Sequence, residues 1–370
     1  MNRLVALDAP GGQTFVDELQ RVWADGDAAF PVDQRLPIAT KTQLFERFGV
    51  AVVVGPDFDR ATLDTGWPIE PGDALVVATS GSTGSPKGVV LTHDAVAASA
   101  ASTSERLAVT SGDHWLACLP LSHVGGLSVV TRALHHGTRL TVHPGFDADA
   151  VQRSGASLVS LVATALRRID SSIFRAIVLG GSRPPADRPP NTISTYGMTE
   201  TGSGVVYERR PLDGVELRIV DSEVQVRGPM LLRCYRDGTD PLTPDGWFAT
   251  GDLGEVDADG LLSVYGRRDD LIITGGENVW PEPIEALLRE HQAVDDAAIV
   301  GTPDPEWGEI VTVLVVPADR TDPPSLESLR DAVKAGLPAF CAPRRVVICE
   351  KLPRTTLGKL IRRGLADLAG

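Results

Sequence analysis

Cysteine, methionine and aromatic residues are scarce in this chain of 370 residues, which has four Cys, three Met and 5% Phe, Trp and Tyr. The cysteines form none of the closely spaced pairs that hold zinc, so we expect them to be reduced and structural. Basic residues are fewer than acidic ones, which gives a formal net charge of −14. This charge argues against a nucleic-acid-binding surface, which needs concentrated Lys and Arg.

Long apolar runs are also lacking. No run approaches the length of a bilayer-spanning helix, so we expect no membrane span. Residues 1–10 lack the basic-then-apolar pattern of a secretory signal. The expected compartment is therefore the cytoplasm.

What the chain does have is a hydroxyl- and glycine-rich segment over residues 79–88, directly after an apolar strand predicted at 74–78. Glycine lets backbone N–H groups approach an anion, and Lys87 adds a positive charge. A nucleotide P-loop is excluded, because Lys87 follows proline and residues 89–91 indicate a strand rather than a helix. We predict a phosphate clamp between two strands, with a plain polar turn as the alternative. The candidate phosphate ligands are Thr79, Ser80, Gly81, Ser82, Thr83, Gly84 and Lys87.

The predicted fold is α/β. With 42% hydrophobic residues the chain can bury a large core, and its length predicts two domains. Strand-like and helix-like runs alternate from residue 74 to about 196, which indicates a layered α/β domain. Short strands from 215 to 235 predict a small β-region, and the segments after residue 267 predict a compact α+β domain.

Four further clusters follow the phosphate loop. They are Ser-Thr-Tyr-Gly-Met-Thr-Glu-Thr (194–201), Trp-Phe-Ala-Thr-Gly-Asp (247–252), Gly-Arg-Arg-Asp-Asp leading into Gly-Gly-Glu-Asn (266–278), and Pro-Arg-Thr-Thr-Leu-Gly-Lys (353–359). In this order, and from roughly residue 70 to the end, the sequence resembles the adenylate-forming acyl-CoA synthetase superfamily. The resemblance implies an enzyme that uses ATP, Mg²⁺ and CoA.

The resemblance implies nucleotide roles that fit the chemistry of the side chains. The Tyr196 ring would cover adenine, Thr199 would meet the α-phosphate, and Glu200 would hold magnesium through oxygen. Asp252 would accept both ribose hydroxyls, and Arg267 would contact ribose or phosphate. Alone, Tyr196 would equally fit a core aromatic and Asp252 an ordinary loop aspartate.

The resemblance also implies two domains, an ATP- and acid-binding domain over residues 1–268 and a small mobile domain over 269–370. Asp269 would be the hinge, although it would also fit a simple cap. The segment Gly275, Gly276 and Glu277 would line the pantetheine tunnel in the second half-reaction.

Lys359 is the residue that we predict to promote adenylation. It would join the substrate carboxylate to the α-phosphate and stabilise charge at phosphorus, with no acid–base step. The alternative is a solvated basic face that Lys359 shares with its neighbours Lys351, Arg354, Arg362 and Arg363.

The acid pocket is predicted around Leu-Ser-His-Val-Gly-Gly-Leu (121–127). In the family, His123 would border the acyl pocket and the carboxylate, whereas amino-acid-activating relatives need an aspartate there. Arg132 lies in the apolar run 128–134, where burying a guanidinium is costly unless an anion meets it. The alternative is an outward-facing arginine on an amphipathic helix. Further candidates for the pocket are Gly180, Gly181 and Gly197.

The His123-to-Arg132 arrangement, with residues 160–164 and 207–215, resembles o-succinylbenzoate-CoA ligases of menaquinone synthesis, whose substrate is a dicarboxylate. We therefore predict a ligase that converts o-succinylbenzoate to an acyl-adenylate and then to its CoA thioester, with Arg132 on the carboxylate that is not activated. The alternatives are a medium-chain or aryl acyl-CoA ligase, an enzyme that acylates a carrier protein, and a non-catalytic nucleotide-binding homologue. A homodimer is implied by relatives.

Overall fold

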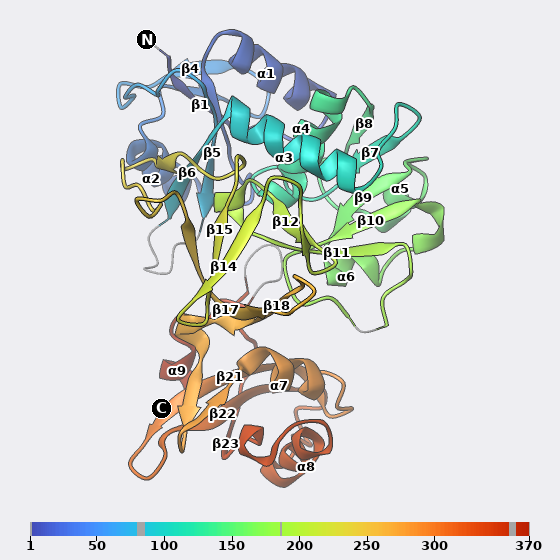
Figure 1. The fold of residues 1–370 in the computed structure, drawn as a ribbon, viewed down its shortest axis with the longest axis vertical. Helices are drawn as coiled ribbons and strands as arrows, with labels where there is room; N and C mark the ends of the chain where they lie inside the picture. The colour runs from blue at the N-terminus through green and yellow to red at the C-terminus, as the bar shows by residue number, and fades with distance from the viewer. Residues whose placement is uncertain (1, 80–85, 186, 355–359, 370) are drawn as a thin grey trace. The chain divides into compact units, whose positions relative to one another are not determined.

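The computed structural model describes residues 2–79, 86–185, 187–354 and 360–369 (Figure 1). Lys359 and the loop residues Ser80, Gly81, Ser82, Thr83 and Gly84 lie outside the described residues, so their roles stay predictions. The chain divides into two compact units. The first comprises Met1–Arg218, Gln225–Ala249 and Asp257–Leu262, and the second comprises Ile219–Val224, Thr250–Val256 and Ser263–Gly370. The predicted domain boundary after Arg268 remains a prediction.

The first unit contains a seven-stranded sheet that carries the two ends of the phosphate loop. In spatial order its strands are β16 (Cys234–Tyr235), β6 (Lys87–Thr92), β5 (Asp73–Thr79), β2 (Ala28–Pro31), β1 (Leu4–Leu7), β3 (Val52–Val54) and β4 (Arg60–Thr62). Strands β5 and β6 are antiparallel, with Thr79 opposite Lys87. The predicted arrangement of two strands flanking the loop is therefore confirmed. Helix α1 (Gln13–Ala24) connects β1 to β2, and helix α2 (Ile38–Phe48) connects β2 to β3.

A second seven-stranded sheet in the same unit is largely parallel. In spatial order its strands are β13 (Arg210–Pro211), β12 (Gly204–Tyr207), β11 (Thr192–Gly197), β10 (Ala176–Leu179), β9 (Leu158–Leu161), β7 (His114–Ala117) and β8 (Arg139–Val142). The short helices α5 (Ala148–Gln152) and α6 (Ala163–Leu166) belong to its connections. Ligands in open α/β sheets bind beyond the carboxyl ends of the strands. Here the ends of β10 and β11 lead into the glycine pair at 180–181 and the Tyr-Gly-Met-Thr-Glu turn.

Helices α3 (His93–Arg106) and α4 (Val124–His136) pack against each other between the two sheets (Figure 1). Helix α3 contacts β5, β6 and β12, and α4 contacts β7, β8 and β9. The predicted cap of α3 is confirmed, because the Thr92 hydroxyl accepts a hydrogen bond from Ala95 N at 3.1 Å. Helix α4 can lie close to the backbone at Leu119 because Gly126 has no side chain. A Cβ at Gly126 would lie 2.4 Å from the Leu119 carbonyl oxygen.

A buried carboxylate joins the beginnings of three strands in the second sheet. Asp113 lies just before β7 and accepts hydrogen bonds from Arg175 Nε and Nη2, both at 2.9 Å, and from Ser157 Oγ at 2.8 Å. Ser157 precedes β9 and Arg175 precedes β10. Burial raises the pKa of Asp113, but hydrogen bonds from Arg175, Thr110 and Ser157 outweigh it and lower the pKa to about 2.

The Asp113→Asn variant is expected to unfold about 2 kcal/mol more easily at neutral pH, because it loses hydrogen bonds to a charged acceptor. The folded-state pKa of about 2 lies below the ordinary 3.8, so the stabilisation is complete above about pH 4 and is lost as pH falls toward 2. Urea unfolding from pH 7 to pH 2 measures both effects. Equal stability of variant and wild type at pH 7 would contradict the assignment.

The predicted small β-region is correct only in part, because the strand predicted at 231–235 contributes β16 (Cys234–Tyr235), which pairs with β6 in the first sheet. The other two predicted strands, 215–220 and 223–226, lie in a four-stranded sheet after β13. Its strands, in spatial order, are β14 (Glu216–Val220), β15 (Glu223–Arg227), β17 (Phe248–Val256) and β18 (Leu262–Arg267). The candidate ribose ligands Asp252 and Arg267 lie on β17 and β18, which are neighbours in this sheet.

The C-terminal part of the second unit is a five-stranded sheet covered by helices. Its strands are β20 (Glu277–Val279), β19 (Ile272–Thr274), β22 (Gly308–Pro317), β21 (Val294–Asp304) and β23 (Arg345–Ile348), with β23 parallel to β22. Alternate residues of β22 face two cores: Val313 packs with residues of α7 (Pro281–Leu288) and α8 (Leu326–Gly336), and Leu314 packs with Leu365 of α9 (Leu365–Leu368). Within the described ranges, no helix is long and apolar enough to cross a bilayer.

Candidate active site

The Tyr-Gly-Met-Thr-Glu turn lies where β11 ends and a short 3-10 helix, η2 (Thr199–Thr201), begins. Thr199 and Glu200 are half-buried in this helix, and Gly202 ends it in the left-handed region at φ 68°. The segment before β16 holds the backbone of this turn, because Leu232 N donates to the Glu200 carbonyl oxygen at 2.8 Å. The residue Glu200 therefore lies at the carboxyl edge of the second sheet.

Tyr235 connects this turn to the phosphate loop. Its hydroxyl donates to Glu200 Oε1 at 3.1 Å, and Lys87 Nζ lies 4.5 Å from the centroid of its ring. Tyr235 is on β16, which pairs with β6 so that Tyr235 is opposite Val89. Sequence reasoning missed this residue, because only the strand order brings residue 235 beside residue 87. The structure therefore brings Lys87 and Glu200 together through one aromatic side chain.

The three glycines predicted for the acid pocket lie at the ends of neighbouring strands. Gly180 and Gly181 follow β10, and Gly197 ends β11. A Cβ at Gly197 would lie 2.2 Å from the Ser203 carbonyl oxygen, so a larger residue would push the turn outward. Their position fits the prediction, but a contact with an acid remains a prediction.

Arg132 is buried, at 2% exposure, on the inner side of α4. Its guanidinium donates to the hydroxyl oxygens of Ser203, Ser160 and Tyr207, the last two at 3.5 Å, and lies 5.7 Å from the centroid of the Trp115 ring. The alternative of an outward-facing arginine is therefore wrong.

No acidic side chain of the described residues lies within ion-pair distance of Arg132. Its Nε is buried and has no hydrogen-bond partner in the described part of the chain. A buried charge is costly unless an anion pairs with it, and hydroxyl groups compensate only part of that cost. The guanidinium is thus prepared for an anion that the described residues do not supply. Ser203 was not foreseen from the sequence, because it lies beyond the recognised turn.

His123 begins α4 as the residue before its first turn. Its Nε2 lies 4.0 Å from Asp33 Oδ2, and Arg35 holds that carboxylate with Nε at 2.8 Å from Oδ1. Burial lowers the pKa of His123 from its ordinary 6.5 and outweighs the Asp33 carboxylate, which raises it. The imidazole is therefore neutral at pH 7. Asp33 and Arg35 had no recognisable motif and were missed in the sequence.

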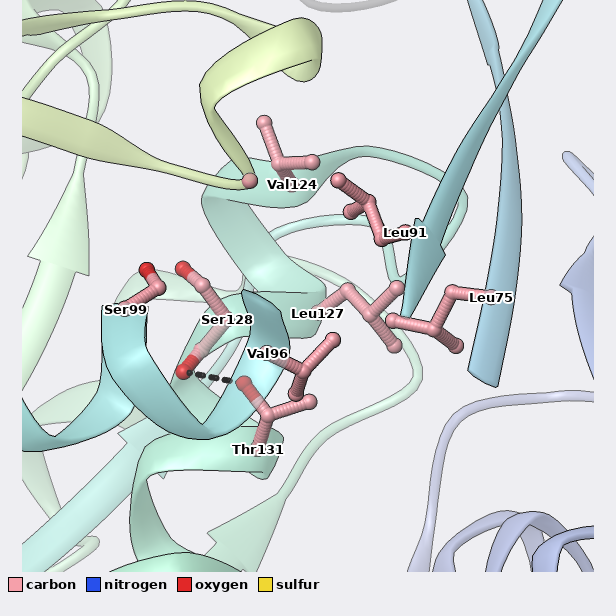
Figure 2. A pocket seen from close by; sticks show the side chains of 9 residues that line it. Leu75, Leu91, Val96, Ser99, Val124, Leu127, Ser128 and Thr131 are labelled. Carbon is pink, nitrogen blue, oxygen red and sulfur yellow. Dashed lines mark hydrogen bonds between the residues drawn. The ribbon is translucent and has the colours of Figure 1, made fainter. Parts of the chain in front are cut away.

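A small pocket lies beside these groups, between the first sheet and helices α3 and α4 (Figure 2). Its apolar lining comes from Leu75, Leu91, Val96, Val124 and Leu127, and its polar lining includes Ser99, Ser128 and Thr131. The dashed line in Figure 2 is the bond from Thr131 Oγ1 to the Ser128 carbonyl oxygen, at 3.2 Å. The Ser128 hydroxyl also accepts from Ser203 Oγ at 3.3 Å. Ser203 thus links this pocket to the Arg132 guanidinium.

The candidate ribose ligands form an ion pair in the second unit. Asp252 is 7% exposed, and its Oδ1 lies 3.0 Å from Arg267 Nε. Arg267 Nη1 also donates to the Thr250 carbonyl oxygen at 2.6 Å. The structure brings these two predicted residues together on adjacent strands. Asp269 follows within a short 3-10 helix (Arg268–Asp270) and is exposed, and its hinge role is untested.

The Gly275-Gly276 turn packs against Trp307. Gly275 N donates to the Trp307 carbonyl oxygen at 2.9 Å, and a Cβ at Gly275 would lie 2.6 Å from the indole ring. The Arg344 guanidinium stacks on the Trp307 ring, 3.8 Å from its centroid. Arg344 is exposed and forms no ion pair with an acidic side chain in the described ranges. Glu277 is exposed at the start of β20.

The donor set suits magnesium rather than a metal held by protein alone. Among the described residues, no group of three or more His, Cys, Asp or Glu could hold an ion. Mg²⁺ keeps several waters and uses one or two carboxylates together with substrate phosphates. One half-buried carboxylate, Glu200, close to a phosphate-loop lysine fits that requirement.

Comparison with known proteins agrees with this geometry. The AMP-binding enzyme family matches residues 32–235, and the AMP-binding enzyme C-terminal domain matches residues 283–359. The chain belongs to the AMP-binding enzyme family. The resemblance drawn from the motifs and the α/β class with a large N-terminal and a small C-terminal domain are thereby confirmed.

Among the relatives, the probable 2-succinylbenzoate–CoA ligase of Mycobacterium tuberculosis is 36% identical, over 97% of this chain and 97% of that protein. The 2-succinylbenzoate–CoA ligase of Bacillus cytotoxicus is 34% identical, over 90% of this chain and 76% of that protein. The o-succinylbenzoate CoA synthetase of Bacillus subtilis, solved with its acyl-adenylate intermediate, superposes with a TM-score of 0.88 at 27% identity, over 98% of this chain and 88% of that one. The same enzyme has been solved with ATP and magnesium, with a TM-score of 0.86.

Proposed function

We propose that this chain is an AMP-forming acid–thiol ligase that activates o-succinylbenzoate with ATP and transfers it to CoA, a step of menaquinone synthesis. The main support for this function is the buried Arg132 guanidinium, which has hydroxyl partners but no acidic partner in the described part of the chain. An acid with a second carboxylate would supply the missing anion. Relatives named for this substrate support the assignment.

In the first half-reaction the chain binds and orients ATP. The phosphate loop and Lys87 would hold the phosphates, Tyr196 would cover adenine, and Thr199 would meet the α-phosphate. Asp252 and Arg267 would bind the ribose. Glu200 would hold Mg²⁺, which when bound supplies positive charge to the phosphates.

The substrate carboxylate then attacks the α-phosphorus, and pyrophosphate leaves with its electron pair. Neutral His123 would border the reacting carboxylate without pairing with it, which leaves that carboxylate nucleophilic. Lys359 would stabilise the charge that develops at phosphorus. Arg132 would bind the other carboxylate in bidentate fashion, since its planar fork matches that geometry.

In the second half-reaction the CoA thiolate attacks the acyl carbon of the mixed anhydride, and AMP leaves. The anhydride has a good leaving group, so the attack needs little further activation. The Gly275-Gly276 turn would let pantetheine approach the backbone, with Asp269 as the hinge that changes the domain arrangement. We further propose that the enzyme acts in the cytoplasm. We also propose that it forms a homodimer, and light scattering on the purified protein would test this oligomeric state.

Acid-dependent pyrophosphate release tests the function. The purified protein is supplied with ATP, Mg²⁺ and o-succinylbenzoate, benzoate or octanoate, each with and without CoA. Selective turnover of o-succinylbenzoate, with formation of its thioester, is expected. Preference for benzoate or octanoate would replace the substrate while keeping the ligase, and no release with any acid would favour a non-catalytic nucleotide-binding homologue. Thioester formation on a carrier protein but not on CoA would change the acceptor.

Arg344 is expected to help bind the phosphates of CoA, because it is an exposed cation beside the Gly275 turn. The Arg344→Glu variant should raise the KM for CoA about 10-fold, the loss expected for one charge-assisted contact. Pyrophosphate release without CoA should not change. Arg320→Glu, which makes the same charge change in an exposed segment, is the control. An unchanged KM for CoA would remove Arg344 from the CoA site.

A further inference from the structure

The contacts of Tyr235 separate two opposite charges that the proposed function needs. The Glu200 carboxylate is bound at Oε1 by the Tyr235 hydroxyl, at 3.1 Å, and the Lys87 ammonium lies 4.5 Å from the centroid of the same ring. Lys87 forms no ion pair with any acidic side chain in the ranges that the structure describes. Hydrogen bonds from Thr239 lower the pKa of the exposed Asp237, and the Lys87 charge lowers it further. Lys87 and Glu200 also attract each other, and the Tyr235 side chain contacts both of them.

The surroundings hold Tyr235 firmly in this position. Its side chain is buried at 7% exposure, and β16 pairs with β6 at Tyr235 and Cys234. Tyr235 N donates to the Thr239 carbonyl oxygen at 2.8 Å, which closes the turn that follows. An aromatic face attracts an ammonium group without neutralising it, and a phenol holds one carboxylate oxygen while leaving the other to a second partner. Glu200 Oε2 has no hydrogen-bond partner among the described residues.

We propose that Tyr235 is a positioning residue that prevents Lys87 and Glu200 from neutralising each other. It thereby keeps the ammonium available to the phosphates of ATP and the carboxylate available to Mg²⁺. This inference rests on the proposed nucleotide roles of Lys87 and Glu200, but not on the identity of the acid. It predicts that the hydroxyl and the ring of Tyr235 have separable effects.

Calorimetric titration with ATP, with and without Mg²⁺ and in the absence of acid and CoA, separates the two effects. Tyr235→Phe removes only the hydroxyl, so the Kd of ATP without Mg²⁺ should stay within twofold of wild type. The Kd with Mg²⁺ should rise about 10-fold, as expected for a hydrogen bond to a charged group. Tyr235→Leu removes the ring as well, so Lys87 should pair with Glu200 and ATP should bind about 10-fold more weakly even without Mg²⁺.

Rescue distinguishes this role from simple loss of packing. In Tyr235→Leu/Glu200→Gln, Lys87 can no longer pair with the Glu200 carboxylate, and the exposed Asp237 carboxylate acts on Lys87 in the wild type as well. The Mg²⁺-free Kd of ATP should therefore return to within about threefold of wild type. A packing defect would not be repaired by this second change. If the Leu variants do not fold, Tyr235→Phe in the Glu200→Gln background serves instead, where the hydroxyl should have no effect on the Mg²⁺ dependence. Tyr265→Phe is the matched control, because Tyr265 also hydrogen-bonds a glutamate, Glu255.

Wild-type Mg²⁺ dependence in Tyr235→Phe, or no rescue in the double variant, would overturn the inference. Pyrophosphate release by the wild type with o-succinylbenzoate is measured on the same preparation. Its absence, together with the expected ATP-binding pattern, would reject the proposed acid while supporting Tyr235. Normal release with unaltered ATP binding in the variants would reject Tyr235 while supporting the proposed function.

Discussion

Replacement of Arg132 by methionine is expected to abolish selective use of o-succinylbenzoate. The variant removes the guanidinium that is buried among Ser160, Ser203 and Tyr207 and leaves the second carboxylate of the substrate without a partner. Loss of one side of a buried charge pair costs about 2–5 kcal/mol, so kcat/KM for o-succinylbenzoate should fall at least about 30-fold. The KM for ATP should change little, and the slow background turnover of octanoate or benzoate should not fall.

The stability of the same variant tests whether Arg132 is structural. Arg132 has no acidic partner among the described residues, so methionine, an apolar side chain of similar length, should leave the melting temperature unchanged or raise it. A lower melting temperature with an equal loss on all acids would show a packing role and contradict the substrate assignment. Arg139→Met, at an exposed position of β8, controls for loss of a positive charge.

Local sequence patterns sufficed for much of the fold and of the nucleotide site. The strands that flank the phosphate loop, the Thr92 cap and the Asp252–Arg267 pair all lie within or between recognisable motifs. Each depends on residues close in sequence or on a motif whose order is characteristic. Arg132 was also predicted, because a charge inside an apolar helix pattern is informative in itself.

Residues that act across the sheets were not predictable from one sequence. Tyr235 reaches Glu200 only because β16 pairs with β6, although 35 residues separate them in the chain. Asp33 reaches His123 from the loop after β2, and Trp307 reaches Gly275 from the turn between β21 and β22. Strand order and side-chain packing place these contacts, and neither is encoded in a local pattern.

The largest loss in the first half-reaction is expected from Lys359→Met. If Lys359 stabilises the charge at the α-phosphorus, its removal should lower acid-dependent pyrophosphate release about 100- to 1,000-fold, the effect typical of one lost transition-state donor. The KM values for ATP and acid should change much less, because the interaction forms fully only in the transition state. Rapid-quench measurement of acyl-adenylate formation gives the rate directly.

The second half-reaction provides the internal control for Lys359. When synthetic acyl-adenylate and CoA are supplied, the Lys359→Met variant should form thioester at nearly the wild-type rate, because phosphorus chemistry is then bypassed. Lys351→Met removes a neighbouring exposed cation and should change neither half-reaction. If Lys351→Met and Lys359→Met both cause the same small loss, the solvated basic face would be the correct interpretation. Selective loss of adenylation in Lys359→Met would instead assign this one ammonium to the phosphoryl centre, as the position of Lys359 in the Pro-Arg-Thr-Thr-Leu-Gly-Lys motif predicts.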